Sequence, residues 1–242
     1  MLVKIQKNYN ELSEKAAEIL TKEISKNPPL IIGFATGSTP LGLYKKLVLA
    51  YKNKKISFSN ITGFNLDEYY KIKGEDKNSY SYYLFKNIFN HINIKKSNIN
   101  LINGNAENPE KECENYEEKI KNKPIDIQIL GVGVNGHIAF NEPGSDFNSR
   151  TRLVRLSRET IKSNSRFFKN KGKVPKQALT MGISTIMKAR KIIVLASGKE
   201  KAEAIFHLVK GKATKRWPIT SLKNHKNLIV LIDREAASLI KS

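Results

Sequence analysis

The sequence predicts an α/β fold of three layers, α/β/α, with a Rossmann-like, mainly parallel sheet and helices on both of its faces. Short apolar or β-branched runs alternate with longer amphipathic stretches along the chain. No internal repeat and no Gly-, Ser- or Pro-rich linker interrupts this alternation. The 242 residues, 40% of them hydrophobic, can bury one substantial core, so we expect a single domain over residues 1–242.

Five runs have the length and composition of buried strands: Leu30–Thr36, Ile61–Leu66, Ile125–Leu130, Lys191–Ala196 and Leu228–Ile232. The stretches with helical spacing, several of which start at Ser, Asn or Pro, are Asn10–Lys26, Pro40–Lys52, Ser79–Phe89, Pro109–Lys121 and Lys199–Lys210. Ligands of parallel sheets bind beyond the carboxyl ends of the strands, so the residues after each strand are the first candidates for a site.

The least regular segment, 142–175, is rich in Arg, Ser and Asn and predicts a long loop plus one helix. Long loops in compact domains are more often functional or mobile than inert. We therefore expect a lid over the site in this segment.

The composition narrows the class of protein. The 43 Lys and Arg against 22 Asp and Glu give a net charge of +21, but the lysines are scattered, which indicates a solvated surface rather than a specific nucleic-acid site. The single Cys113 lies among glutamates and has no partner for an internal disulfide, which fits a reducing compartment. Without a signal peptide or an apolar run of roughly 18 residues, we expect a cytoplasmic protein without a membrane span.

The first core strand is followed by the segment 36–40, Thr-Gly-Ser-Thr-Pro, and then by a predicted helix. Small residues let the backbone approach a ligand, hydroxyls add donors, and a helix N-terminus favours anions. This pattern predicts a phosphate site, with an ordinary capped turn as the alternative. It is not a Walker loop, because the Gly-Lys-Ser/Thr ending is absent.

Two acids, Asp67 and Glu68, follow the second strand in an aromatic setting. A carboxylate at the end of a strand acquires a raised pKa and serves as a base if it is partly desolvated. A capping or structural role is an equally open interpretation of either acid. Location favours Asp67 as the functional one.

The third strand leads into the segment 131–142, whose glycines match G-x-G-x-x-G. No amphipathic helix follows and no acid ends a strand about 20 residues later, so we exclude a nicotinamide site. The glycines instead permit a bend that presents His137, with Asn135 and Glu142 available to orient it. The alternative is a structural histidine.

The sequence gives weaker indications of a metal site and of cationic side chains that bind a ligand. The four histidines lie far apart and none joins Cys or acids at ligand spacing, so we expect no metal. Arg166 and Lys201 could each bind a phosphate or could simply be solvated.

Five motifs in order closely resemble those of the glucosamine-6-phosphate deaminase family. They are Thr36–Pro40, Asn65–Tyr69, Gly136–Pro143, Ser165–Phe168 and Ala178–Gly182, and Leu231–Leu239 is similar to the short bacterial form. The resemblance runs nearly end to end. It implies conversion of α-D-glucosamine 6-phosphate and water into D-fructose 6-phosphate and ammonia, without metal or organic cofactor.

The resemblance also implies roles for individual residues. His137, oriented by Glu142 and Asn135, would take the proton of the anomeric hydroxyl and help to open the ring. Asp67 would move a proton between C2 and C1. The substrate phosphate would be bound by Thr36, Gly37, Ser38, Thr39, Arg166 and Lys201.

Two departures from the family pattern carry expectations of their own. Asn135 replaces an aspartate of the best-known members, so we expect a less basic His137 and more of the orienting role on Glu142. Members activated by N-acetylglucosamine 6-phosphate use an arginine, a lysine and a C-terminal extension. Here Arg152 matches the arginine, Val154 replaces the lysine and the extension is missing, so we expect a monomer, with a weak dimer as the alternative, rather than an activated hexamer.

Three rival functions follow from the same residues. A 6-phosphogluconolactonase-like hydrolase would share the fold and the phosphate loop but would not need Asp67 to move a proton. A non-catalytic sugar-phosphate sensor would need a DNA-binding helix-turn-helix, which the sequence does not indicate. A nonspecific polyanion binder would lose affinity steeply with salt.

Overall fold

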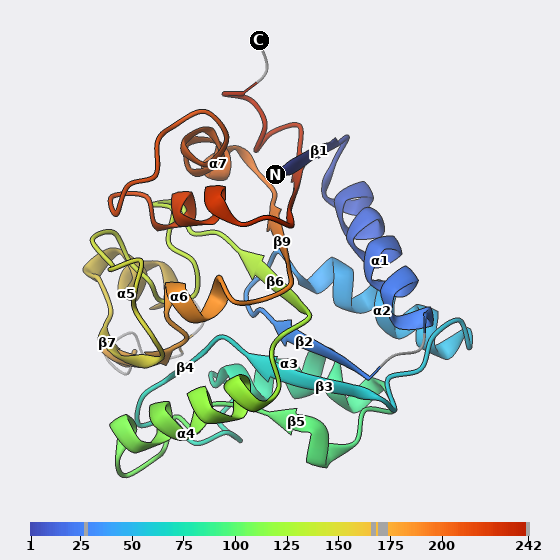
Figure 1. Ribbon diagram of the computed structural model, residues 1–242, viewed down its shortest axis with the longest axis vertical. Helices are drawn as coiled ribbons and strands as arrows, with labels where there is room; N and C mark the ends of the chain where they lie inside the picture. The colour runs from blue at the N-terminus through green and yellow to red at the C-terminus, as the bar shows by residue number, and fades with distance from the viewer. Residues whose placement is uncertain (27–28, 166–167, 169–173, 241–242) are drawn as a thin grey trace.

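The computed structural model describes residues 1–26, 29–165, 168 and 174–240, and its centre is a parallel sheet flanked by helices (Figure 1). Within the described residues this sheet has seven strands, in the spatial order β1 (Leu2–Gln6), β10 (Leu228–Asp233), β9 (Lys191–Ala196), β6 (Ile127–Gly131), β2 (Leu30–Phe34), β3 (Ile61–Asn65) and β5 (Ile99–Asn100). Each neighbouring pair is parallel. The predicted α/β class is confirmed.

The five predicted strands are all present, and their uninterrupted apolar runs have a simple cause. Helices cover both faces of the sheet, so side chains pointing either way are buried. In β9 every residue from Ile192 to Ala196 is inaccessible to solvent. The additional strands β1 and β5 lie at the two edges of the sheet.

The helices begin where the sequence provides a cap. Asn8, Ser79 and Asn108 each accept a backbone hydrogen bond at a helix start. The helices are α1 (Tyr9–Ser25), α2 (Leu41–Lys52), α3 (Tyr80–Asn87), α4 (Pro109–Asn122), α5 (Arg158–Asn164), α6 (Ile183–Ile186) and α7 (Ala202–Val209). None of those in the described part of the chain combines the length and apolar character needed to cross a lipid bilayer.

A second, antiparallel sheet joins β4 (Asp67–Tyr69), β8 (Gln177–Thr180) and β7 (Arg152–Arg155), in that order. The sequence analysis did not predict this sheet. The expectation of a loop plus one helix over 142–175 was incomplete, since the segment contains β7 as well as α5. Strands this short carry little periodicity, and their pairing is decided by distant segments.

The direction in which the sheet is built reverses between β2 and β6. After β2 the chain adds β3 and β5 on one side, and it then returns to place β6 on the other side of β2. Loops that leave neighbouring parallel strands in opposite directions open a crevice at the carboxyl ends. The 36–40 loop follows β2, and the segment 131–142, here called the His137 loop, follows β6.

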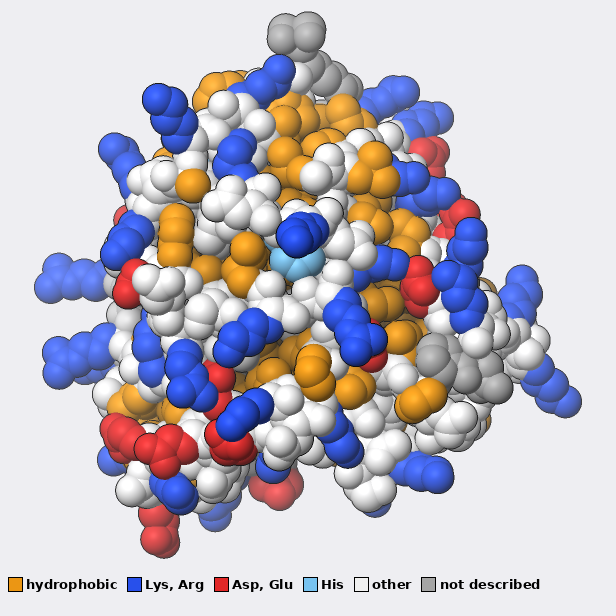
Figure 2. Space-filling view, in the orientation of Figure 1, with side chains coloured by type: hydrophobic (Ala, Val, Ile, Leu, Met, Phe, Trp, Pro, Cys, Tyr) orange, Lys and Arg blue, Asp and Glu red, His pale blue; other side chains and the backbone are white. Residues whose placement is uncertain are grey.

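Lys and Arg side chains are spread around the visible face of the molecule rather than gathered in one patch (Figure 2). A histidine lies near the middle of this face with cationic side chains around it. The distribution agrees with the scattered lysines of the sequence.

Candidate active site

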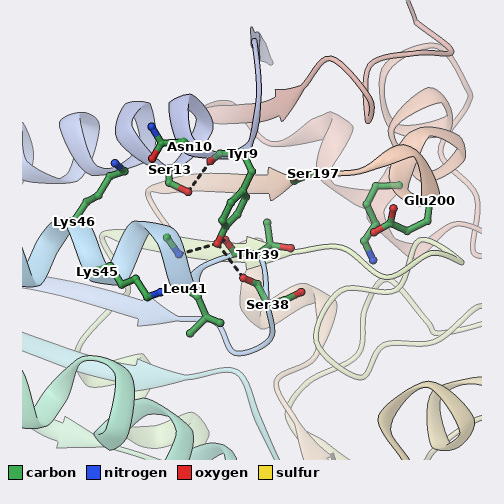
Figure 3. Close-up of a pocket in the computed structure, with 12 residues that line it drawn as sticks. Tyr9, Asn10, Ser13, Ser38, Thr39, Leu41, Lys45, Lys46, Ser197 and Glu200 are labelled. Carbon is green, nitrogen blue, oxygen red and sulfur yellow. Dashed lines mark hydrogen bonds between the residues drawn. The ribbon is translucent and has the colours of Figure 1, made fainter. Parts of the chain in front are cut away.

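The 36–40 loop borders a cavity of about 640 Å³. Ser38 and Thr39 line it together with Lys201, which lies just before α7, and with residues of α1 and α2 (Figure 3). The loop turns at Gly37, whose φ of 95° is unfavourable for residues with a side chain. The structure thus brings three of the predicted phosphate ligands to one cavity. Arg166, also predicted, lies outside the described residues.

Asp67 lies in β4, opposite Thr180 of β8, and is only 6% exposed. Burial raises the pKa of the Asp67 carboxyl well above its usual range, and the charge of Glu68 adds to this effect. Within the described residues, no hydrogen bond is donated to the Asp67 carboxylate. A carboxylate that is neither solvated nor hydrogen-bonded is a stronger base than an exposed one.

The backbone beside Asp67 is fixed by Asn65, a polar residue buried at the end of β3. Its Nδ2 donates to the Asp67 carbonyl at 2.8 Å, and its Oδ1 accepts from the Ile102 amide at 3.0 Å and the Tyr116 hydroxyl at 3.0 Å. These contacts satisfy both ends of the amide and leave the position of Asp67 little freedom.

Aromatic rings surround this part of the site. Tyr69 packs against Tyr80, Phe140 and Phe168 at centroid distances of 5.0, 5.6 and 5.7 Å. Tyr80 and Phe140 stack at 5.7 Å. The sequence analysis noted the aromatic setting of Asp67 but did not predict that Tyr80 of α3 and Phe140 of the His137 loop contribute to it, although Phe140 lies within the motif Gly136–Pro143.

Glu68, the neighbour of Asp67, has a structural role at the start of α3. Its carboxylate accepts hydrogen bonds from the amides of Tyr69, Tyr80 and Ser81 and from the Ser79 hydroxyl, all between 2.8 and 2.9 Å. Burial raises its pKa, and these donors act against the rise. Of the two interpretations left open for the paired acids, the capping role belongs to Glu68.

His137 lies in a chain of polar contacts. Its Nδ1 is 2.7 Å from Asn135 Oδ1, and Asn135 Nδ2 donates to Glu142 Oε2 at 3.1 Å. Glu142 Oε1 in turn accepts from the Ser157 hydroxyl at 3.1 Å and from the Thr160 hydroxyl. Because a carboxylate only accepts, the amide of Asn135 must turn its oxygen toward the ring, which places the proton on Nδ1 and leaves Nε2 as the basic nitrogen.

Burial lowers the pKa of His137, the charge of Glu142 raises it, and the charge of Lys201 lowers it further. The direction agrees with the expected less basic imidazole, but the largest cause is burial rather than Asn135. The expected orienting role of Glu142 is indirect. Glu142 Oε2 is 3.7 Å from Nδ1, beyond hydrogen-bond distance, so Asn135 makes the contact and Glu142 orients Asn135.

Close packing requires glycine at two positions of the His137 loop. A Cβ on Gly133 would lie 2.1 Å from the imidazole of His137, and one on Gly136 would lie 2.6 Å from the Trp217 ring. Gly136 also has a φ of 78°. The dinucleotide-like spacing therefore arises from a backbone that passes close to its own histidine.

Strand β8 joins the two catalytic candidates. Thr180 pairs with Asp67, and its Oγ1 accepts from the Phe140 amide at 3.0 Å. Asn141 of the His137 loop donates to the Met181 carbonyl at 2.8 Å. The motif 178–182 was the signal for this element, but the sequence did not indicate what it contacts.

Arg152, matched in sequence to an effector-binding arginine, lies in β7. Its Nη1 donates to Asn141 Oδ1 at 2.9 Å, so it contacts the same asparagine that fixes the His137 loop. Among the described residues, no group of three or more His, Cys, Asp or Glu side chains could hold a metal ion.

Residues 5–230 match the family model described as glucosamine-6-phosphate isomerases/6-phosphogluconolactonase. The glucosamine-6-phosphate deaminase of Thermoanaerobacter sp. is 53% identical over 99% of this chain and 95% of its own. That of Clostridium botulinum is 48% identical over 100% and 99%.

Among solved structures, a monomeric glucosamine-6-phosphate deaminase superposes with a TM-score of 0.96 at 45% identity, covering 99% of this chain and 100% of its own. The 6-phosphogluconolactonase of Trypanosoma brucei superposes with a TM-score of 0.80 at 21% identity, covering 99% and 98%. The second likeness shows the shared fold alone.

Proposed function

The chain belongs to the glucosamine-6-phosphate isomerase/6-phosphogluconolactonase family, and we propose that it converts α-D-glucosamine 6-phosphate and water into D-fructose 6-phosphate and ammonia. The observation that carries this choice is Asp67, a buried carboxyl with a raised pKa in the strand that follows β3. Proton transfer between two carbons needs such a base, whereas hydrolysis of a lactone does not. The names of the relatives that are about half identical support the same choice.

In the proposed first step His137 opens the sugar ring. Its neutral Nε2 accepts the proton of the anomeric hydroxyl, and a proton is delivered to the ring oxygen as the C1–O5 bond breaks. The lowered pKa of His137 keeps the imidazole neutral and ready to accept. Asn135 and Glu142 keep Nε2 free by holding the proton on Nδ1.

In the proposed second step Asp67 removes the proton from C2 of the open chain and returns it to C1. As C2 loses its proton, O1 takes up a proton and an enolamine forms, and protonation at C1 converts it into an iminium ion at C2, whose hydrolysis releases the proton again. Water adds to that carbon, ammonia leaves, and the C2 carbonyl of fructose 6-phosphate remains. The aromatic rings around Asp67 limit its solvation, which maintains its basicity.

The phosphate is proposed to bind Thr36, Gly37, Ser38, Thr39 and Lys201, with Arg166 as a further ligand. A dianion bound at this distance from C1 and C2 supplies binding energy and orientation for the reacting carbons. The reaction as written uses no metal and no organic cofactor.

The proposal extends to the pathway, the compartment, the oligomeric state and the domain organisation of the enzyme. The enzyme acts as a cytoplasmic hydrolase of amino-sugar catabolism, downstream of N-acetylglucosamine, and binds no specific nucleic acid. A monomer is supported by the similarity to a monomeric deaminase. The chain is one domain, and α5 within the candidate lid 142–175 contacts both halves of the site, since Thr160 reaches Glu142 and Asn164 donates to the Tyr69 hydroxyl at 2.8 Å.

The test measures ammonia and fructose 6-phosphate together after adding glucosamine 6-phosphate, with and without a chelator. Equal, chelator-resistant release of both products is expected. Binding of the sugar phosphate without turnover would instead favour the sensor, and hydrolysis of 6-phosphogluconolactone without deamination would favour the lactonase.

A further inference from the structure

Tyrosine hydroxyls from different helices reach the backbone carbonyls of the 36–40 loop and of the residue just before it. Tyr83 of α3 donates to the Gly37 carbonyl at 2.5 Å. Tyr44 of α2 donates to the Ala35 carbonyl, also at 2.5 Å. Neither hydroxyl has a role in the reaction described above.

Tyr9, the first residue of α1, makes the most extensive contact with the loop (Figure 3). Its hydroxyl lies 3.1 Å from the carbonyls of both Ser38 and Thr39 and accepts from the Gly42 amide at 2.8 Å. The Gly42 amide is one of the first donors of α2, the very groups expected to bind an anion at a helix start. Tyr9 uses this donor, so an anion must be bound by other amides.

The loop itself supplies those amides. Across a trans peptide the carbonyl of one residue and the N–H of the next point in opposite directions. Because the carbonyls of Gly37 and Ser38 face the tyrosines, the N–H groups of Ser38 and Thr39 face away from them. Within the described residues, the amides of Gly37, Ser38 and Thr39 donate no hydrogen bond. Successive free amides of this kind form an anion-binding concavity.

We propose that Tyr9 and Tyr83 are positioning residues of the phosphate site. Their hydroxyls hold the carbonyls of Gly37 and Ser38 toward the tyrosines, and this orientation aims the amides of Ser38 and Thr39 at the substrate phosphate. The inference rests on the proposed function in one respect, that the anion is the phosphate of a sugar phosphate. The two tyrosines act on binding rather than on chemistry, because their hydroxyls contact backbone atoms of residues 37–42 and neither Asp67 nor His137.

The experiment compares Tyr9→Phe, Tyr83→Phe and the double variant with wild type. Removing one hydroxyl should raise the KM for glucosamine 6-phosphate about threefold, and removing both about tenfold, with kcat within about twofold. The dissociation constant of inorganic phosphate, measured by calorimetry, should rise in parallel. Tyr51→Phe is the matched control, since the Tyr51 ring packs on Phe58 and its hydroxyl has no hydrogen bond within the described residues.

The phosphate titration separates the two proposals, because it does not require turnover. If wild type fails to deaminate but phosphate binding weakens in the tyrosine variants, the proposed function fails and the positioning role stands. An unchanged KM and an unchanged phosphate affinity in the double variant would overturn the positioning role. A fall in kcat at constant KM would overturn it as well.

Discussion

The two halves of the candidate active site differ in what surrounds the groups that we propose for proton transfer. Asp67 lies in a short strand among aromatic rings, and no hydrogen bond from the described residues reaches its carboxylate. His137 lies in a loop and is held by a chain of hydrogen bonds, here called the relay. This chain runs from Asn135 to Glu142 and on to the hydroxyls of Ser157 and Thr160. Desolvation raises the pKa of Asp67 and so makes its carboxylate a stronger base. The relay instead selects which ring nitrogen of His137 is basic.

This difference predicts that mutations in the two halves have different effects on stability and activity. A group that depends on desolvation is replaced at no structural cost by a neutral isostere. A group that depends on a relay is sensitive to residues that never contact the substrate.

The largest effect is expected for Asp67→Asn. Loss of the base should lower kcat by about 10²- to 10⁴-fold while the substrate still binds. The measurement is steady-state kinetics with ammonia and fructose 6-phosphate as paired products. Activity close to wild type would remove Asp67 from the mechanism.

The same variant should be more stable than wild type at neutral pH. The folded pKa of Asp67 lies above the unfolded one, so between the two values the folded protein holds a proton that the unfolded chain has lost. Stability from this group is therefore present in acid and lost as pH rises through the folded pKa. Thermal unfolding should show a gain for the variant that shrinks as the pH falls to the ordinary aspartate range.

Glu142→Gln tests the relay of the other half. The amide of Asn135 loses its carboxylate acceptor and is free to rotate, so kcat/KM should fall about 10²-fold. Ser157→Ala is the matched control, because it removes a single donor to Glu142 and keeps the charge. Equal losses in the two variants would contradict the relay.

Glu68→Gln tests whether the two adjacent acids, Asp67 and Glu68, contribute differently to stability. Glu68 accepts four hydrogen bonds, three of them from the start of α3, so the N–H groups of an amide side chain there would face other donors. We expect a loss of about 1–3 kcal/mol in the free energy of unfolding, measured by denaturant titration. A stabilised variant, as expected for Asp67→Asn, would show that Glu68 is not a cap.

The smallest effect is expected for Asn135→Asp, which introduces the acid that the resemblance implies for the best-known members. A carboxylate next to Nδ1 favours the imidazolium, so the pKa of His137 should rise toward its ordinary value. An NMR titration of the imidazole reports this directly, and wild type should titrate at lower pH than the variant. No difference would mean that burial alone sets the basicity of His137.

The sequence was sufficient for five strands of the large sheet, without its edge strands β1 and β5, but for none of the small sheet. The strands of the large sheet are buried on both faces, so they read as continuous apolar runs such as 191–196 and 228–233. The strands β4, β7 and β8 have three or four residues each, too few for a period to register. The pairing of β4 with β8 joins residues more than 100 positions apart, such as Asp67 and Thr180.

The residue pattern was enough to identify the chemistry available at the strand ends: small and hydroxyl residues after β2, an acid after β3, and a histidine in a glycine-rich bend after β6. The folded chain was needed to show which acid is a cap and which is left desolvated. It also decided that Asn135 rather than Glu142 contacts the imidazole, and that tyrosines of two helices contact the 36–40 loop. The physical reason is that pKa values and hydrogen-bond partners depend on burial and neighbours in space, which local residue patterns do not encode.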